Sequence, residues 1–335
     1  MSVHLFAGLF LLRASFIAIA LATSLMSVVA SSPALAEAVT VRVGHFPNIT
    51  HVQALVAHGL TRQGRGWFEE RLGPDVKIEW FVYNAGPSAT EALFADSIDL
   101  TYVGPSPAIN AYAKARGEDI RIVAGAVEGG AALLVHSDSN LRKPADFRGK
   151  KLGTPQLGNT QDVAARAWLT EGGLKVTLTG GDVQVIPTAN PDQLGLFQRR
   201  DLDAVWTVEP WVSRLEIEAN GRVLVEEKDA ITTVLVSSTK MLARRRDLVR
   251  RFVAAHEELT EWIKAHPAEA QAAAREELGA ETRTEIKPEL LAKAWPRIAV
   301  TSSIDRAPLD SFVKKAKEAG FLRTMPDLSR LIERP

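Results

Sequence analysis

Small neutral polar residues stand at four places where a strand-like run gives way to a helix-like segment. The four runs are 41–50, 80–90, 100–108 and 151–162, and each ends among Gly, Pro, Ser, Thr or Asn. A helix start presents free backbone N–H groups at the positive end of its dipole, which suits a small anion. No base stands beside the Ser and Thr residues in sequence to activate a hydroxyl. The pattern therefore predicts capture of an anion without catalysis.

The last of these junctions carries the fullest set of donors, Asn159, Thr160 and Gln161. An anion on the N–H groups of this helix start would also receive the hydroxyl of Thr160 and the amide of Gln161. Ordinary capping by Asn159, with Asp162 at N3, explains the same triplet without a ligand. Similar helix starts elsewhere in the chain favour the anion-binding interpretation of this triplet.

Two of those similar starts are expected at serine residues. Ser88 to Glu91 matches a capping box with Ser88 as the N-cap, and Ser106-Pro107 fits an N-cap followed by proline at the first helical position. We therefore expect Ser88 and Ser106 to hold positions equivalent to that of Thr160.

Histidine and asparagine stand at the first junction. Asn48 and His51 are candidate donors to a bound oxyanion. His45, His51 and His58 suggest a metal cluster, but their spacings of six and seven residues do not match the usual ligand pairs. His51 and His58 would lie two helical turns apart, about 10 Å, which is too far for one ion. The sequence therefore predicts no metal site.

Strand-like and helix-like segments alternate through residues 39–126 and again through 131–237. This alternation predicts right-handed βαβ units and a mainly parallel sheet in each half. After residue 240 the chain reads as nearly continuous amphipathic helix. We expect an α/β fold of two lobes crossed by two strands, with a helical C-terminal segment.

The expected division places the first lobe in residues 37–128 and the second in 129–232. Residues 233–335 would return to the first lobe and supply the C-terminal helices. The crossing strands are expected near 126–131 and 230–236. Ligands of open α/β sheets bind beyond the carboxyl ends of the strands, so a cleft between the lobes would gather the four polar junctions.

The segment from Trp206 to Trp211 combines large side chains with one carboxylate. Trp206 is interpreted as the end of a core strand. Trp211 follows Pro210 at a strand-to-helix turn and would pack against the apolar part of a ligand. Glu209 would orient a donor or close the lobes through a hydrogen bond. A lone Glu without a carboxylate partner does not indicate acid–base catalysis.

The chain shows no complete catalytic or cofactor motif. In Gly104-Pro105-Ser106-Pro107-Ala108, Ala108 replaces the second glycine of a nucleophile elbow, and Pro107 has no N–H for an oxyanion hole. Neither a Walker A nor a dinucleotide-binding glycine motif occurs, and cysteine is absent. We expect a protein that is not an enzyme and uses no cofactor. An exported hydrolase or lyase is the alternative of a different class, and it would need a nucleophile or metal with an orienting base.

Residues 1–36 read as a secretory signal peptide. A weakly cationic start, an apolar stretch from Ala14 to Ala30 and the Ala34-x-Ala36 pattern predict cleavage after Ala36. The apolar stretch is short for a membrane span. Forty basic and forty acidic residues leave a net charge of zero, so no global field attracts nucleic acid or anionic lipid. We expect a soluble periplasmic protein without a nucleic-acid partner.

Five motifs make the chain similar to the periplasmic binding proteins of ABC importers for aliphatic sulfonates, nitrate and taurine. The likeness covers essentially the whole chain after the signal peptide. The motifs are Gly44-His45-Phe46-Pro47-Asn48, Asn84-Ala85-Gly86-Pro87-Ser88, Val103-Gly104-Pro105-Ser106-Pro107, Asp146-Phe147-Arg148-Gly149-Lys150-Lys151-Leu152-Gly153, and Asp203-Ala204-Val205-Trp206 through Pro210-Trp211.

The family implied by this resemblance has two α/β lobes joined by a two-strand hinge, and it closes on its ligand. The implied partners are a small-molecule anion and the membrane permease of an ABC importer, and the protein would be a monomer. Many relatives carry a Gly-Thr/Ser-rich turn where this chain has Gly104-Pro105-Ser106-Pro107. The implied ligand-binding residues are Asn48, Ser88, Ser106, Thr160 and Trp211, together with Gln161 and Glu209.

An aliphatic sulfonate or sulfate ester is the expected ligand. A sulfonate is ionised at any physiological pH and offers acceptors only. Neutral donors and helix ends hold it without burying a matching cation, which would carry its own desolvation cost. The alternatives are nitrate, which needs a smaller and flatter pocket, taurine, and a thiamine-precursor pyrimidine, which needs more stacking and an acceptor for its amine.

Overall fold

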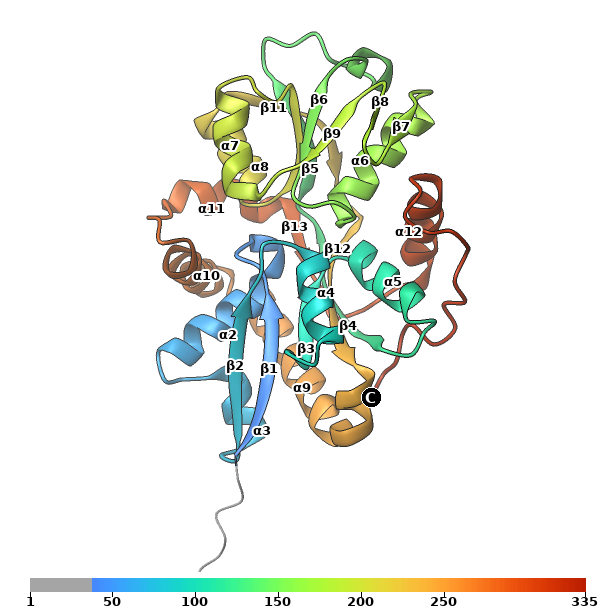
Figure 1. The fold of residues 1–335 in the computed structure, drawn as a ribbon. Coiled ribbons are helices and arrows are strands. Elements are labelled where there is room, and N and C mark those ends of the chain that lie inside the picture. Colours follow the sequence, from blue (N-terminus) through green and yellow to red (C-terminus); the bar gives the residue numbers. More distant parts are fainter. Residues whose placement is uncertain (1–37) are drawn as a thin grey trace, which may run out of the picture. The chain divides into compact units, whose positions relative to one another are not determined.

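The computed structural model describes residues 38–335, so the expected signal peptide and its cleavage after Ala36 lie outside the described residues. Two β-sheets organise this range, and helices cover both faces of each (Figure 1). Across 38–335, no helix combines the length and the apolar character needed to cross a membrane.

Six strands form the sheet of the first lobe, in the order β13-β4-β12-β3-β1-β2. β1 pairs in parallel with β2 and β3, whereas β12 is antiparallel to β3 and β4, and β13 is antiparallel to β4. The strands are β1 (Val39–His45), β2 (Val76–Val82), β3 (Leu100–Val103), β4 (Ile120–Gly129), β12 (Ile231–Ser238) and β13 (Ile298–Val300).

Five strands form the sheet of the second lobe, in the order β11-β5-β10-β6-β9. β6 pairs in parallel with β9 and β10, whereas β5 is antiparallel to β10 and β11. The strands are β5 (Ala131–His136), β6 (Lys151–Thr154), β9 (Gln184–Pro187), β10 (Ala204–Val208) and β11 (Gly221–Glu227). A separate ladder pairs β7 (Val176–Thr177) with β8 (Gly180–Gly181).

The chain leaves the first sheet at Gly129-Gly130 and returns to it between β11 and β12. Both glycines have positive φ, 73° and 74°, which an L side chain rarely adopts. A Cβ at Gly129 would also lie 2.4 Å from the carbonyl oxygen of Arg297. This crossing therefore requires glycine. The residue boundaries expected for the lobes stay a prediction.

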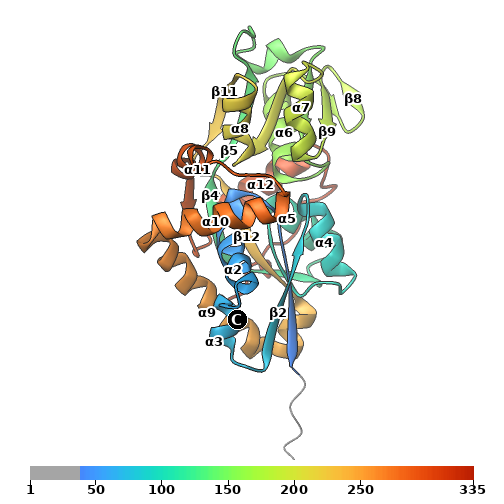
Figure 2. The same cartoon turned by 90° about the vertical axis from the view of Figure 1, so that its left-hand side faces the viewer.

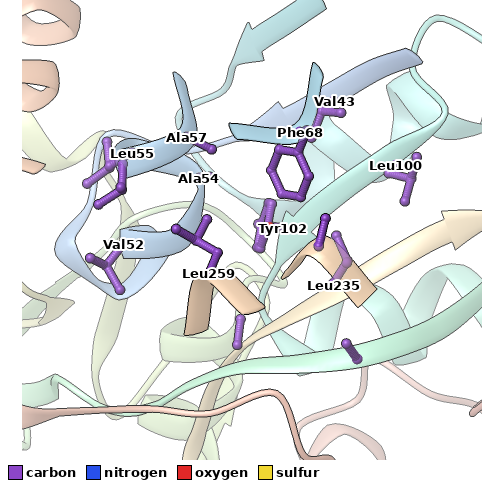
Figure 3. Packing of buried hydrophobic residues seen from close by; sticks show 14 of the residues in the cluster. Val43, Val52, Ala54, Leu55, Ala57, Phe68, Leu100, Tyr102, Leu235 and Leu259 are labelled. Carbon is purple, nitrogen blue, oxygen red and sulfur yellow. The ribbon is translucent and has the colours of Figure 1, made fainter. Parts of the chain in front are cut away.

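Two helical layers enclose the first sheet (Figure 2). Phe68, Tyr102 and Leu259 meet in one layer, between α3, β3 and α9 (Figure 3). That layer contains α2 (Val52–Arg62), α3 (Trp67–Leu72), α9 (Thr239–Ala265), α10 (Pro267–Thr282) and α11 (Pro288–Ala294), and the other contains α4 (Gly86–Phe94), α5 (Pro105–Lys114) and α12 (Arg306–Glu318).

Alternation along the central strands places apolar side chains in both layers. On β12, Leu235 packs into the layer of α2 and α9, whereas Val234 and Val236 pack into the layer of α4, α5 and α12. Every residue of β12 is buried, including the polar Thr232, Thr233, Ser237 and Ser238. Burial on both faces is expected for a central strand that lies between two helical layers.

The second lobe repeats the arrangement. α6 (Thr160–Glu171) covers one face of its sheet, and α7 (Asn190–Gln198) and α8 (Trp211–Glu218) cover the other. Along β5, Leu133 packs on the α6 side and Leu134 on the α7 and α8 side. Trp206 is buried in the α6-side core, which confirms that it belongs to a core strand, although it lies in the middle of β10 and not at its end.

Both sheets are mixed, which corrects the expected mainly parallel arrangement. The antiparallel pairs arise around the crossings: β12 returns between β3 and β4, and β5 lies beside β10. The sequence analysis also missed β11, β13 and α3. β13 and α3 are short, and β11 is half-buried along its length, so none shows a strong hydrophobic period.

A buried carboxylate fastens the start of α6 to the second sheet. Asp162 accepts hydrogen bonds from Thr154 Oγ1 at 2.9 Å, Gly158 N at 2.9 Å and Arg166 Nε at 3.1 Å. Asp162→Ala would leave the buried Arg166 guanidinium without this partner, and breaking such a pair costs about 3–5 kcal/mol. We expect a loss of that order in the free energy of unfolding, measured by urea denaturation.

Asp201→Ala is the matched control. The Arg199 Nε to Asp201 Oδ2 distance is also 3.1 Å, but both side chains are exposed. Solvent screens such a pair, so we expect little loss of stability. Similar losses in the two variants would show that burial does not govern the contribution of Asp162.

Candidate functional site

A small pocket lies between the two lobes, where helices begin beyond the strand ends. Its volume is about 20 Å³, room for about one water molecule. Residues of both lobes line it: Phe46, Asn48, Thr50, His51, Asn84, Ala85, Gly86, Gly104, Pro107, Pro155, Asn159, Thr160, Gln161, Asn190, Val208 and Thr232.

Five helical segments begin at this pocket. Each follows the carboxyl end of a strand, namely β1, β2, β3, β6 or β9. The first N–H groups of a helix lack partners inside it and stand at the positive end of its dipole. The lining residues at these starts are Asn48 before the 3-10 turn η1 (Ile49–His51), Ala85 before α4, Gly104 before α5, Asn159 before α6, and Asn190 as the first residue of α7.

The start of α6 leaves one hydroxyl available. Asn159 Oδ1 accepts from the backbone N–H of Asp162 at 2.8 Å, which confirms the expected cap. Asn159 Nδ2 donates to Gln161 Oε1 at 3.1 Å. Thr160 Oγ1 is buried and has no hydrogen-bond partner within residues 38–335. Because Asn159 does the capping, the Thr160 hydroxyl remains free for a ligand.

Gly104 allows the two lobes to approach at this point. A Cβ on Gly104 would lie 2.2 Å from Thr160 Oγ1 and 3.5 Å from the carbonyl oxygen of Thr232. The backbone of Gly104 is in an ordinary extended conformation, with φ −68° and ψ 156°. Glycine is therefore required here by close approach and not by the backbone angle.

The pocket lining is uncharged. Burial, followed by the nearby His45, holds the pKa of His51 well below its usual value, so the imidazole is neutral. His51 Nδ1 is buried and, in the described part of the chain, has no hydrogen-bond partner. Among the described residues that line the pocket, none is Lys, Arg, Asp or Glu. Amides, hydroxyls, a neutral imidazole and backbone N–H groups are the available donors.

Three of the expected site residues, Asn48, Ser88 and Trp211, take part in hydrogen bonds between the lobes beside the pocket. Trp211 Nε1 donates to Asn48 Oδ1 at 3.0 Å, and Gln156 Nε2 donates to Ser88 Oγ at 3.1 Å. Trp211 is almost fully buried, at 5% exposure. Neither Ser88 nor Trp211 is among the lining residues. These bonds hold the lobes in what we call the closed arrangement.

Glu209 also lies outside the lining, and its carboxylate is occupied. It accepts from Ser213 N at 3.1 Å, Ser213 Oγ at 2.9 Å and Arg297 Nη1 at 2.9 Å. Burial raises the pKa of Glu209, and the donors from Arg297 and Ser213 oppose that rise. Because Arg297 directly precedes β13 of the first sheet, this ion pair connects the lobes.

The expected helix starts at two serines are wrong. α4 begins two residues before Ser88, so the capping box does not form, and α5 begins one residue before Ser106. Pro87 and Pro105 stand in the first turns, where a missing N–H costs nothing, so the helices start earlier. Ser106 Oγ is buried without a partner in residues 38–335, and Ser106 is not among the lining residues.

The structure thus places Asn48, Thr160 and Gln161 in the lining and the other expected residues around it. Sequence reasoning missed Asn190 and Thr232, which also line the pocket. The Asn190-Pro191 dipeptide is a signal for a turn or helix start and could have identified Asn190. Thr232 lies within β12, where no local pattern distinguishes it.

Known proteins match this chain over about half to three quarters of its length. A binding protein of Brucella abortus (strain 2308), named provisionally, is 27% identical over 265 residues, 76% of this chain and 75% of that protein. An Escherichia coli K12 protein, named provisionally as an aliphatic sulfonates-binding protein, is 32% identical over 163 residues, 48% of this chain and 49% of that protein.

A solved structure shows the same fold. The alkanesulfonate-binding protein of Xanthomonas axonopodis pv. citri bound to MOPS aligns with a TM-score of 0.74 and 21% identity, covering 90% of this chain and 100% of that chain. These matches confirm the resemblance found in the sequence and the expected periplasmic binding protein fold. The family model described as NMT1-like matches residues 34–276, so the chain belongs to the NMT1-like family.

Proposed function

We propose that this chain is the solute-binding component of an ABC importer and captures an aliphatic sulfonate or sulfate ester as its lobes close. The observation that carries the proposal is the uncharged pocket at five helix starts, with the unpaired hydroxyl of Thr160 buried in it. The names of the Escherichia coli relative and of the Xanthomonas structure support the same ligand class.

The donors of the pocket suit a strong-acid anion. A sulfonate or sulfate ester stays ionised and only accepts hydrogen bonds. Backbone N–H groups at helix starts bind anions, and hydrogen bonds to a charged acceptor are stronger than neutral ones. The neutral imidazole of His51 has no charge to lose above neutral pH. Binding by such a lining does not depend on a titrating cation.

Ligand access requires the lobes to separate. The bonds from Trp211 to Asn48 and from Gln156 to Ser88 cross the gap between the lobes beside the pocket, so a ligand would enter when they break. The Gly129-Gly130 crossing and the connection between β11 and β12 supply the hinge. Closure would then bring α4, α5 and α6 starts onto one anion from both sides.

The same geometry supports binding over catalysis. Thr160 Oγ1, a buried hydroxyl of the lining, has no hydrogen-bond partner in residues 38–335, so no base among these residues is in position to take its proton. Glu209, the nearby carboxylate, is engaged by Ser213 and Arg297. We propose reversible capture without turnover.

Location and partners follow from this role. The expected signal peptide would be removed after Ala36, releasing the protein into the periplasm as a monomer that delivers its ligand to a membrane permease. The expected lobe limits of 37–128, 129–232 and 233–335 describe the units that would move against each other.

The first prediction for this function concerns Thr160. Thr160→Ala removes a hydroxyl from the pocket and leaves Asn159 to cap α6. Loss of a hydrogen bond to a charged group costs about 1.5–3 kcal/mol, which is roughly one to two decades in affinity. Calorimetry with the best ligand from sulfonates, sulfate esters, taurine, nitrate and pyrimidines should show this loss.

Thr170→Ala is its control, because Thr170 is exposed on the same helix. It should bind as the unmodified protein does. Unchanged affinity in Thr160→Ala would remove Thr160 from the site. A best ligand that is a pyrimidine, or turnover of any compound in the panel, would overturn the proposed function itself.

The second prediction is that Trp211 reports closure. Its indole donates across the lobe gap to Asn48, so opening would expose the ring to water. Saturating ligand should change the intrinsic fluorescence, and Trp211→Phe should lose most of that change. Trp206→Phe should retain it, since Trp206 is buried within the core of the second lobe. A response carried by Trp206 would show that closure does not alter the surroundings of Trp211.

A further inference from the structure

Four ionisable side chains meet inside the first lobe, apart from the ligand pocket. His45 ends β1, His58 lies on α2, and Glu277 and Glu281 lie one turn apart on α10. We call them the histidine–glutamate cluster. The side chains of His45 and Glu281 are fully buried, and those of Glu277 and His58 are 1% and 9% exposed. None of the four lines the pocket.

The facing atoms of this cluster lie unusually close together. His45 Nε2 and His58 Nδ1 are 3.1 Å apart, and each lies 2.9 Å from Glu281 Oε1. His58 Nδ1 also lies 2.9 Å from Glu277 Oε1. His45 Nε2, His58 Nδ1 and Glu281 Oε1 therefore lie close to one another, and Glu277 reaches the group at His58.

Protons on the two imidazole rings cannot turn all of these close contacts into hydrogen bonds. His45 Nδ1 lies 3.3 Å from the carbonyl oxygen of Phe46, where only an N–H can bond, so a neutral His45 presents the lone pair of Nε2 to the cluster. His58 Nδ1 can carry one proton but faces three polar atoms. If both facing nitrogens were protonated, two N–H groups would oppose each other at 3.1 Å.

One oxygen of the cluster has no partner at all. Glu281 Oε2 is buried and accepts no hydrogen bond from the described residues. An unsatisfied carboxylate oxygen in the interior is costly. A cation between the imidazoles and Glu281 would neutralise the carboxylate. The facing atoms would then lie close together because they are ligands of the same ion.

We propose that His45, His58 and Glu281 form a binding site for one Zn²⁺ ion, whose remaining position is open to water. Two imidazole nitrogens with a carboxylate oxygen are a typical ligand set for zinc, and the preferred geometry is tetrahedral. Bonds of about 2.0–2.2 Å place tetrahedral ligand atoms about 3.3–3.6 Å apart. The three facing atoms, at 2.9–3.1 Å, need only a small outward movement to reach that spacing.

Surrounding residues hold the ligands in place. The bond from His45 Nδ1 to the Phe46 carbonyl directs Nε2 inward, as the outer hydrogen bond of a ligating histidine does. Arg62 Nε lies 2.9 and 3.0 Å from the two oxygens of Glu277. Trp80 packs against both imidazole rings, with ring centroids 5.5 and 5.3 Å away.

Close packing of α10 against α2 brings the glutamates to the histidines. At Gly59 on α2, the helices lie so near that a Cβ would be in van der Waals contact with Glu277 Cβ, at 3.4 Å. Sequence spacing predicts no metal here because it compares neighbouring histidines only. The fold instead joins residues 13 positions apart, His45 and His58, and adds carboxylates from more than 200 residues away.

The test uses untagged protein that has been stripped with a chelator. Zn²⁺ titrated against a chromophoric competitor should bind at one ion per chain. Glu281→Gln keeps the size of the side chain but removes the anionic ligand, so zinc affinity should fall at least about 100-fold. Glu276→Gln is the matched control, because it makes the same change at an exposed position on the same helix. It should bind zinc as the unmodified protein does.

Co²⁺ in place of zinc should give the strong visible absorption of a tetrahedral site in the unmodified protein and lose it in Glu281→Gln. His58→Gln, at the edge of the cluster, is the second variant and should show the same loss. Circular dichroism of each metal-free variant checks folding. No stoichiometric zinc binding, or equal binding in the unmodified protein and a folded Glu281→Gln or His58→Gln, would overturn the site.

Discussion

The unpaired N–H groups at helix starts are the constraint around which this protein is organised. A parallel strand followed by a short junction sends the next helix back over the sheet, so successive helices begin at the same edge. In this chain five such starts, from both sheets, meet at one small pocket. The polar groups of these backbones need a partner, and a shared anion would serve all of them.

The lining of the pocket is uncharged, and this affects how the lobes can meet. A buried Lys or Arg would bind an anion strongly. When the lobes closed without a ligand, however, its charge would be buried without a partner, at a large cost in free energy. Amides and hydroxyls can instead bond to each other, as Trp211 does with Asn48 and Gln156 with Ser88. Such bonds satisfy part of the polar surface between the lobes, and a bound anion would pair with lining groups that have no partner among the described residues, such as Thr160 Oγ1.

Local patterns predicted much of the fold. Strands and helices alternate through 39–126 and 131–237 as expected, and the cap of α6 by Asn159 forms as expected. The two-lobed α/β fold with its crossings also follows from the order of strand-like and helix-like segments. The mixed sheets were not predictable in this way, because the position of β12 between β3 and β4 is decided by packing across the chain.

The candidate site could also be predicted only in part from the sequence. Asn48, Thr160 and Gln161 line the pocket because each stands at a junction that the sequence marks with polar residues. Local capping rules place the starts of α4 and α5 at Ser88 and Ser106. Both helices begin earlier, because Pro87 and Pro105 fit in their first turns. The meeting of His45 with Glu281 depends on α10 packing against α2, and no local pattern contains that information.

Gly104 has a consequence for how binding is tuned. Its backbone angles suit any residue, so a single methyl group there would leave the separated lobes nearly undisturbed. The overlap with Thr160 belongs to the closed arrangement. Under the proposed opening and closing of the lobes, such a methyl group would lower the population of the closed arrangement and would reduce the apparent affinity in proportion. The absence of a side chain at residue 104 would then set the strength of binding as much as the donors of the lining do.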